Sequence, residues 1–299
     1  MDYRYGTGQM TNLKEKLAAF GLSPERIFEQ VKIAVNEDIS QAGDITSEAT
    51  ISDSQSSAAQ FIAKANGTVC GLHVAATVLE ICEIDEYEIL VDEGGAVQNS
   101  DALITTKGKS KKLLLAERTA LNFLTHLSGI ATLTNLWVKA VSGTNCKIRD
   151  TRKTTPGLRE LDKFAVRMGG GVNHRLTLSE SILIKDNHIM AAGGITKAFK
   201  LVKEKFPNKE IEIEVDNLEQ LSELTSLNPN LVLLDNMSVE QCYQAVLLVN
   251  KRFKLEASGG LTLVNAKAYA ETGVDFLAVG ALTHSAPALD IGLDFRKDK

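Results

Sequence analysis

The chain has 299 residues, of which 44% are hydrophobic and 24% charged, so its apolar content suits one large barrel or two domains. The formal net charge of −5 argues against non-specific attraction to nucleic acid or to an anionic membrane surface. No run approaches the roughly 18 consecutive apolar residues of a membrane-spanning helix. The first residues lack the basic and apolar blocks of a secretory signal. We therefore expect a cytoplasmic protein without nucleic-acid or membrane partners.

The cysteines are few and widely spaced. Cys70, Cys82, Cys146 and Cys242 form no CxxC pair. This spacing predicts buried free thiols in a reducing compartment and argues against a zinc site.

The N-terminal third mixes helix and strand patterns. Its first dozen residues are polar and contain glycine, which is compatible with a disordered arm or with an added tag, and we exclude them from the fold prediction. Pro24 precedes the amphipathic stretch 27–38, which predicts a helix. Stretches 57–71 and 87–95 are typical of short strands ending in glycine turns, with a helix between them over 73–83. Together these patterns predict a small α+β unit.

The longest helical pattern covers residues 113–141. Gly129 is the strongest helix breaker within it. We expect either two helices or one kinked helix.

The remainder of the chain alternates short apolar runs with helix-like stretches, a pattern typical of βα units and a parallel sheet. The runs are residues 146–150, 181–186, 210–215, 231–236, 254–259 and 276–280. Because no glycine-rich dinucleotide fingerprint is present, the pattern favours a closed or nearly closed α/β barrel over a doubly wound sheet. A flavodoxin-like open sheet is the alternative.

Nearly every apolar run ends in a polar residue or glycine, namely Asp150 with Arg152, Lys185, Glu214, Asp235, Ser258 with Gly259, and Gly280. Active sites of α/β barrels form where the carboxyl ends of the strands meet. We therefore expect these residues to surround one opening. For any single residue, simple solvation of a strand end is the competing interpretation.

Basic and imidazole side chains crowd into 34 positions, among them Arg152, Lys153, Arg159, Arg167, His174, Arg175 and Lys185. Guanidinium groups bind carboxylates and phosphates through two parallel hydrogen bonds, and lysine offers a mobile point charge. The cluster indicates a small polyanionic ligand. A solvated basic face is the alternative.

Glu214 and Asp235 end two neighbouring strands and form the acidic counterpart of these cations. Two carboxylates would repel a polyanion unless a divalent cation lay between them. Mg²⁺ bound by one or two carboxylates together with substrate phosphates fits this arrangement. Ordinary ion pairing with nearby lysines is the alternative.

Two glycine-containing loops follow the last two strands. Ser258, Gly259 and Gly260 lie in the first loop, and Gly280 and His284 lie in the second. Backbone N–H groups at such loops bind phosphate well.

The five histidines divide by position. His174 and His284 are site candidates and His188 is a candidate supporting residue. His73 and His126 fall in helical patterns and are expected to pack or to face solvent.

The chain strongly resembles the quinolinate phosphoribosyltransferase family, whose members are also called carboxylating nicotinate-nucleotide pyrophosphorylases, from about Val31 to Asp294. EDISQAGDIT (37–46) is similar to its N-terminal signature. The other similar stretches are AERTALNFLTHLSGIATLT (116–134), DTRKTTPGLR (150–159), GGGVNHR (169–175), LIKDNHI (183–189), EIEVDN (212–217), LLDN (233–236), ASGG (257–260) and VGALTHS (279–285).

The resemblance implies an open-faced α/β sandwich over residues 1–117, followed by an incomplete, about six-stranded parallel α/β barrel over 118–285. The tail, about 286–299, is expected to pack on the first domain. The implied activity is transfer of a phosphoribosyl group to quinolinate with loss of carbon dioxide, in NAD biosynthesis. The family also implies a homodimer in which Arg118 of the partner subunit completes the site.

Family positions carried onto this sequence divide the site in two. Quinolinate would contact Arg118, Arg152, His174, Arg175 and Lys185. Phosphoribosyl pyrophosphate and Mg²⁺ would contact Lys153, Glu214, Asp235, Ser258, Gly259, Gly260, Gly280 and His284, with Glu214 and Asp235 as the metal ligands. Lys153, Lys185, Glu214 and Asp235 would act in the chemical steps.

The match has small departures and leaves alternatives. Thr177 and Glu180 replace residues that are usually Gly and Asp, and 94–114 matches loosely. A paralogous transferase with another acceptor is one alternative, although such a protein should lack part of the dicarboxylate pocket. A Schiff-base aldolase using Lys185 and a non-catalytic binding protein are the others.

Overall fold

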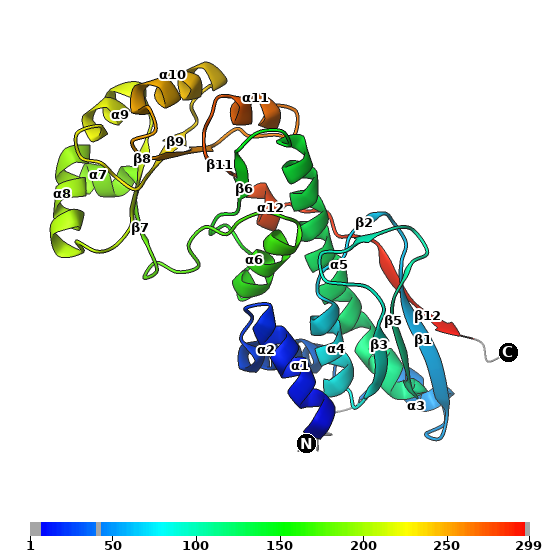
Figure 1. The fold of residues 1–299 in the computed structure, drawn as a ribbon. Coiled ribbons are helices and arrows are strands. Elements are labelled where there is room, and N and C mark those ends of the chain that lie inside the picture. Colours follow the sequence, from blue (N-terminus) through cyan, green and yellow to red (C-terminus); the bar gives the residue numbers. More distant parts are fainter. Residues whose placement is uncertain (1–6, 40–42, 297–299) are drawn as a thin grey trace. The chain divides into compact units, whose positions relative to one another are not determined.

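The computed structural model describes residues 7–39 and 43–296 and divides into two compact units (Figure 1). The first unit comprises the chain up to Leu133, Glu160–Gly169 and the tail from Ala286. The second comprises Thr134–Arg159 and Gly170–Ser285. The expected boundary at 117/118 falls inside a helix, Ser110–Ala140.

The first unit is an α+β structure, as the sequence predicts. Its four-stranded sheet has the order β12-β1-β5-β3 with every pair antiparallel, and a second sheet pairs β2 with β4. The strands are β1 (Ser56–Ala63), β2 (Gly67–Thr68), β3 (Glu86–Ile89), β4 (Ala96–Val97), β5 (Ala102–Lys109) and β12 (Ile291–Arg296). The helices are α1 (Thr7–Ala19), α2 (Pro24–Asp38), α3 (Ile45–Thr50), α4 (Leu72–Ile81), most of α5 (Ser110–Ala140) and most of α6 (Arg159–Met168).

The N-terminal residues that were excluded from the fold prediction are partly helical. Helix α1 begins at Thr7, and the first six residues lie outside the described part of the chain. Leu13 and Leu17 of α1 are buried, four residues apart on one helix face. This apolar face is what keeps the segment in the fold.

Helix α5 is one continuous helix of 31 residues, so of the two alternatives the single helix is the correct one. Gly129 has a packing role. A Cβ atom at this position would overlap the carbonyl oxygen of Pro287 and lie 3.0 Å from Cα of Ala288. Glycine therefore allows the chain before β12 to approach the helix closely.

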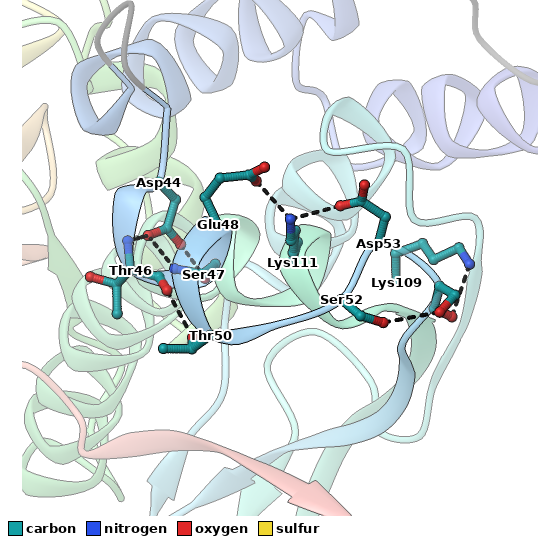
Figure 2. Close-up of polar contacts among 10 residues, drawn as sticks. Asp44, Thr46, Ser47, Glu48, Thr50, Ser52, Asp53, Lys109 and Lys111 are labelled. Atoms are coloured by element: carbon teal, nitrogen blue, oxygen red, sulfur yellow. Dashed lines mark hydrogen bonds and ion pairs between the residues drawn. The ribbon is translucent and has the colours of Figure 1, made fainter.

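Side-chain contacts fix the segment that contains α3 (Figure 2). Asp44 is the N-cap of α3 and accepts hydrogen bonds from the backbone N–H groups of Thr46 and Ser47, both at 3.1 Å. Hydrogen bonds from Ser47 hold the pKa of Asp44 below its ordinary value. Lys111, at the start of α5, lies 2.6 Å from Glu48 and 2.7 Å from Asp53. These pairs connect α3 and the turn before β1 to α5.

The second unit contains a six-stranded parallel sheet with helices outside it. Its strands are β6 (Lys147–Arg149), β7 (Ile182–Ile184), β8 (Ile211–Val215), β9 (Leu231–Asp235), β10 (Lys254–Ser258) and β11 (Phe276–Ala278). Its helices are α7 (Asp186–Ala192), α8 (Ile195–Lys205), α9 (Leu218–Leu224), α10 (Val239–Val249), α11 (Ala266–Glu271) and α12 (Ala281–His284). All six predicted apolar runs form strands.

The strand order identifies an incomplete barrel. The order is β6-β11-β10-β9-β8-β7, so each strand from β7 to β11 lies beside the next in the chain, and β6 joins at β11. This is the cyclic order of a barrel that is open between β6 and β7. It has no reversal of direction of the kind that defines a doubly wound sheet, which rules out the flavodoxin-like alternative. An isolated parallel bridge between Arg149 and Val172 extends the β6 edge.

Other sequence expectations also hold within the described residues. All four cysteines are buried and free. Burial raises the pKa of the Cys82 and Cys146 thiols to about 12 and that of Cys242 to about 11, so these thiols are inert. No helix in residues 7–39 and 43–296 is long and apolar enough to cross a membrane.

Candidate active site

The alternation of side chains along the strands builds the site. Strand β8 is buried along its whole length, and its odd positions (Ile211, Ile213, Val215) are apolar while Glu212 and Glu214 lie between them. Successive side chains on a strand point to opposite faces, so both glutamates share one face. Register pairs Asp235 of β9 with Ser258 of β10. The carboxyl ends of adjacent strands therefore bring these polar side chains together.

A cavity of about 490 Å³ lies at this end of the sheet. It is lined by Thr151, Arg152, Lys153, His174, Arg175, Leu183, Lys185, Glu214, Leu233, Asp235, Asn236, Glu256, Ser258, Gly259 and Ala278. Nine of the thirteen predicted site residues are in this lining. A larger cavity of about 1070 Å³ lies at the opposite, amino-terminal ends of the strands and contains none of them.

The other four predicted site residues, Arg118, Gly260, Gly280 and His284, are not in this lining. Gly280 is beside the site, since a Cβ atom there would lie 3.0 Å from Cδ of Lys153 and 3.2 Å from Nε2 of His284. Gly260 has a φ of +60° and open space around it. Arg118 is an exposed residue of α5 and belongs to the first unit.

Arg152 and Arg175 form the cationic part of the cavity. The Nη1 group of Arg175 donates a hydrogen bond to the carbonyl oxygen of Ser181 at 2.8 Å. The Nε groups of both arginines are buried without a hydrogen-bond partner among the described residues. Burial and then the nearby charge of Arg152 lower the pKa of Arg175. Two adjacent guanidinium groups with unused donors favour an anionic ligand between them.

Glu214 and Asp235 form the acidic part. Nζ of Lys185 lies 3.4 Å from Oε2 of Glu214. Burial raises the pKa of Glu214, against the charge of Lys185, and Asp235 raises it further. Burial and then Asp216 raise the pKa of Asp235. Oxygen donors crowded by like charges fit a divalent cation such as Mg²⁺, which would relieve the repulsion.

A buried carboxylate holds the loop that carries His174. Asp150 accepts hydrogen bonds from the backbone N–H of His174 at 2.7 Å and from Nδ2 of Asn173 at 2.6 Å. Val172 donates its N–H to the carbonyl of Ile148 at 2.9 Å. The loop is therefore fixed against β6.

Two members of the predicted cation cluster have other roles. Arg159 donates to Oγ1 of Thr154 at 3.0 Å and to the carbonyl of Leu176 at 3.3 Å, and so connects two loops. Arg167 belongs to the first unit and donates to the carbonyl of Phe20 at 2.7 Å. The cations that line the cavity are therefore a subset of the cluster seen in the sequence.

Sequence reasoning missed a charged layer beneath the predicted residues. Oε2 of Glu212 lies 2.7 Å from Nε2 of His174, and Nη1 of Arg149 lies 2.8 Å from Oε2 of Glu256. Burial raises the pKa of Glu212 and of Glu256 to about 7. The sequence contained a signal for this layer. Glu212 and Glu256 each precede a predicted site residue, Glu214 or Ser258, by two positions, and residues two apart on a strand share one face.

The loop after β10 requires glycine at position 259. Gly259 has a φ of +84°, and a Cβ atom there would overlap Oδ1 of Asn236. The Asn236 backbone N–H donates to the Ser258 carbonyl at 2.8 Å. The backbone hydrogen bond from Asn236 joins the ends of β9 and β10, and the glycine at 259 leaves room for the Asn236 side chain.

Local contacts explain three further residues. Nδ1 of His188 accepts the backbone N–H of Lys185 at 3.0 Å, which fixes the backbone that carries this lysine. Glu180 accepts the N–H of Leu176 at 2.5 Å, and Thr177 accepts the N–H of Ser179 at 3.3 Å. Thr177 and Glu180, the two departures from the family pattern, therefore stabilise the loop in which they lie.

The chain matches two family models, which together cover most of its length. The quinolinate phosphoribosyl transferase N-terminal domain matches residues 44–128 and the C-terminal domain matches residues 130–294. A relative named nicotinate-nucleotide pyrophosphorylase (carboxylating) from Mycobacterium leprae is 48% identical over 270 residues, which cover 88% of this chain and 95% of the relative.

Solved structures give the same result. The crystal structure of nicotinate-nucleotide pyrophosphorylase from Ehrlichia chaffeensis is 40% identical, with a TM-score of 0.87 and coverage of 90% of this chain and 98% of that one. The nicotinate-nucleotide pyrophosphorylase from Francisella tularensis is 38% identical, with a TM-score of 0.87 and coverage of 91% and 96%. Fold, site and sequence agree, and the chain belongs to the quinolinate phosphoribosyltransferase family.

Proposed function

We propose that the 490 Å³ cavity is where this enzyme joins quinolinate to phosphoribosyl pyrophosphate and releases carbon dioxide and pyrophosphate, forming nicotinate mononucleotide. One observation carries the assignment of the site. Arg152 and Arg175, whose buried Nε groups have no hydrogen-bond partner among the described residues, share a cavity with the carboxylates of Glu214 and Asp235. A dicarboxylate needs the first pair, and a metal-bound pyrophosphate needs the second.

The quinolinate half of the cavity is cationic. Arg152 and Arg175 have free donors for the two ring carboxylates, and Lys185 lines the same cavity. Arg118 of the partner subunit would add a further cation. This set favours a dicarboxylate over nicotinate, because a missing carboxylate would leave buried donors without a partner.

The phosphoribosyl half is built from Lys153, the two carboxylates and the glycine loops. Ser258 and Gly259 line the cavity, and Gly260, Gly280 and His284 lie in the loops beside it. Thr283 donates its hydroxyl to the Lys153 carbonyl at 2.7 Å, which fixes the backbone of this lysine. Glu214 and Asp235 would hold Mg²⁺, which neutralises charge on the leaving pyrophosphate.

The first chemical step needs no general base. The ring nitrogen of quinolinate has a lone pair, which forms the new bond to the anomeric carbon while the bond to pyrophosphate oxygen breaks. Arg152 and Arg175 orient the ring for this attack. Lys153 stabilises the charge that moves onto pyrophosphate, and Glu214 and Asp235 stabilise the positive ribosyl centre.

The second step releases carbon dioxide. The bond between the ring and the carboxylate next to the nitrogen breaks, and its electron pair stays on the ring carbon beside the cationic nitrogen. A proton then adds to that carbon. Lys153 and Lys185 both line the cavity and are the two candidates for the proton donor.

Three wider assignments accompany the reaction. The enzyme would act as a homodimer in which Arg118 completes the partner's site. It would work in the cytoplasm, which the four buried free thiols support. It would need Mg²⁺, which the crowded carboxylates Glu214 and Asp235 support.

The test mixes purified protein, phosphoribosyl pyrophosphate and Mg²⁺ with either quinolinate or nicotinate and follows mononucleotide formation. We expect turnover of quinolinate alone, loss of turnover with EDTA, and recovery when Mg²⁺ is restored. Turnover of nicotinate, or of neither acceptor by folded protein, would contradict the proposal. Turnover that survives EDTA would contradict the metal assignment alone.

A further inference from the structure

Both ring nitrogens of His174 are engaged inside the protein. Nδ1 accepts the backbone N–H of Arg175 at 2.8 Å, and Nε2 lies 2.7 Å from Oε2 of Glu212. A ring nitrogen that accepts an amide N–H has no proton of its own. In this arrangement the ring is neutral, its proton is on Nε2, and Nε2 donates to Glu212.

Glu212 is itself held by a buried charged layer. Glu256 of β10 lies beside it and pairs with Arg149 of β6 at 2.8 Å. The guanidinium carbon of Arg149 lies 4.8 Å from the centre of the Phe276 ring. Glu212 and Glu256 are 6% and 0% exposed, so the layer is inside the barrel and its side chains have little freedom. Residues from the three strands β6, β8 and β10 therefore fix the Glu212 carboxylate, which accepts the hydrogen bond from His174.

His174 connects this buried layer to the proposed quinolinate pocket. The imidazole holds the backbone N–H of Arg175, whose guanidinium lies near the like charge of Arg152. Two neighbouring cations repel each other and would move apart without restraint. A fixed backbone at Arg175 therefore prepares the pocket before the dicarboxylate arrives.

We propose that Glu212 is a positioning residue for quinolinate binding, which acts by holding His174 as the neutral Nε2–H tautomer that fixes Arg175. This inference rests on the proposed function of the cavity. His174, which lines the cavity, would thereby support Arg175. The contacts that carry the proposal are the Glu212–His174 and Arg149–Glu256 pairs, while Oε1 of both glutamates and Nε of Arg149 have no hydrogen-bond partner among the described residues.

A metal ion is the competing occupant of the layer. The ligand atoms of His174, Glu212 and Glu256 all lie within 4.8 Å of one another. A metal there would replace the proton on Nε2. The tautomer of His174 therefore distinguishes the two interpretations.

The first test is nuclear magnetic resonance of protein that contains ¹⁵N-labelled histidine, at pH 7.5 in EDTA-treated and untreated samples. The chain has five histidines, and the signals lost in the His174→Gln variant identify residue 174. We expect one proton-bearing nitrogen, Nε2, and one proton-free nitrogen, Nδ1, in both samples. Two proton-bearing nitrogens, a proton on Nδ1, or a proton-free Nε2 that gains its proton with EDTA would overturn the proposal.

The second test separates positioning from stability. Glu212→Gln keeps an oxygen that accepts from Nε2, whereas Glu212→Met removes it. We expect Glu212→Gln to keep the KM for quinolinate within about threefold, and Glu212→Met to raise it at least about tenfold with the KM for phosphoribosyl pyrophosphate unchanged. Glu210→Met, an exposed position directly before the same strand, is the matched control and should change neither value.

The outcomes are distinct. An unchanged KM for quinolinate in Glu212→Met, or a parallel rise in both KM values, would overturn the specific role of Glu212. If Glu212→Met does not fold, the KM values of Glu212→Gln and the His174 tautomer of the wild-type protein still test the proposal. The tautomer is measured without turnover, so a failure of the proposed function would leave that result standing.

Discussion

Arg175 combines a buried guanidinium with an unused Nε donor, next to a second cation. We expect Arg175→Ala to weaken quinolinate binding by about 2–5 kcal/mol, as for truncation of one partner of a buried charge pair. Titration calorimetry with quinolinate measures this change. Arg252→Ala is the control, because the guanidinium of Arg252 donates to backbone carbonyls, including Leu248 and Thr225, away from the cavity. Equal affinities of Arg175→Ala and wild type would remove Arg175 from the pocket.

Substitution of Gly259 tests whether the loop after β10 binds phosphoribosyl pyrophosphate. Its φ of +84° and the overlap of a Cβ atom with Asn236 both require glycine. We expect Gly259→Ala to raise the KM for phosphoribosyl pyrophosphate at least about tenfold and to leave quinolinate binding nearly unchanged. Gly143→Ala is a matched control, since Gly143 also has a φ of +84° but no atoms within 4 Å of its Cβ position. Similar kinetics of the two variants would remove the 259 loop from the phosphoribosyl site.

Among the elements, α5 shows how packing overrides helix propensity. Alanine is favoured over glycine by about 1 kcal/mol in a helix interior. At position 129, however, a methyl group would overlap the Pro287 carbonyl. We expect Gly129→Ala to lower the free energy of unfolding by about 1–3 kcal/mol, as for overpacking of a core. Urea denaturation measures it, with Asn122→Ala on the exposed face of α5 as control. A more stable Gly129→Ala protein would show that the 287–288 segment does not pack this closely.

The layer formed by β6, β8 and β10 gives a pH prediction. Burial raises the pKa of Glu256 from 4.5 to about 7, so between these values the folded protein holds a proton that the unfolded chain has lost. Stability from this group is therefore present below about pH 4.5 and falls as pH rises toward 7, by at most about 1.4 kcal/mol per pH unit.

Glutamine cannot lose this proton. We expect the melting temperature of Glu256→Gln to rise relative to wild type between pH 5 and pH 7.5, as calorimetry at both values would show. A difference that stays constant with pH would mean that Glu256 does not titrate in this range.

At the scale of the whole molecule, the shared site of the proposed homodimer can be tested by mixing. Arg118→Ala and Arg175→Ala should each be inactive alone. In mixed dimers one site receives both arginines, so a 1:1 co-expressed mixture should recover about a quarter of wild-type activity by random pairing of a two-fold dimer. If Arg118 serves its own subunit, the mixture stays inactive.

Local patterns predicted much of the second unit. Each strand is a short apolar run bounded by polar or glycine residues, so its position could be read without knowing its neighbours. The strand ends that carry Lys185, Glu214, Asp235 and Ser258 followed directly, because parallel strands present their carboxyl ends at one edge. The site residues on long loops were harder to predict, and Arg118 is a candidate only through family resemblance.

What the sequence alone determined is the class of fold, the family and the main content of the cavity, because these depend on local periodicity and on motifs. The tertiary structure decided which cations line the cavity, since Arg159 and Arg167 make contacts outside it. It also decided that Glu212 and Glu256 form a charged layer, and that Gly129 serves close packing. Those features depend on which distant segments meet, and register and burial are set only when the sheets and helices have assembled.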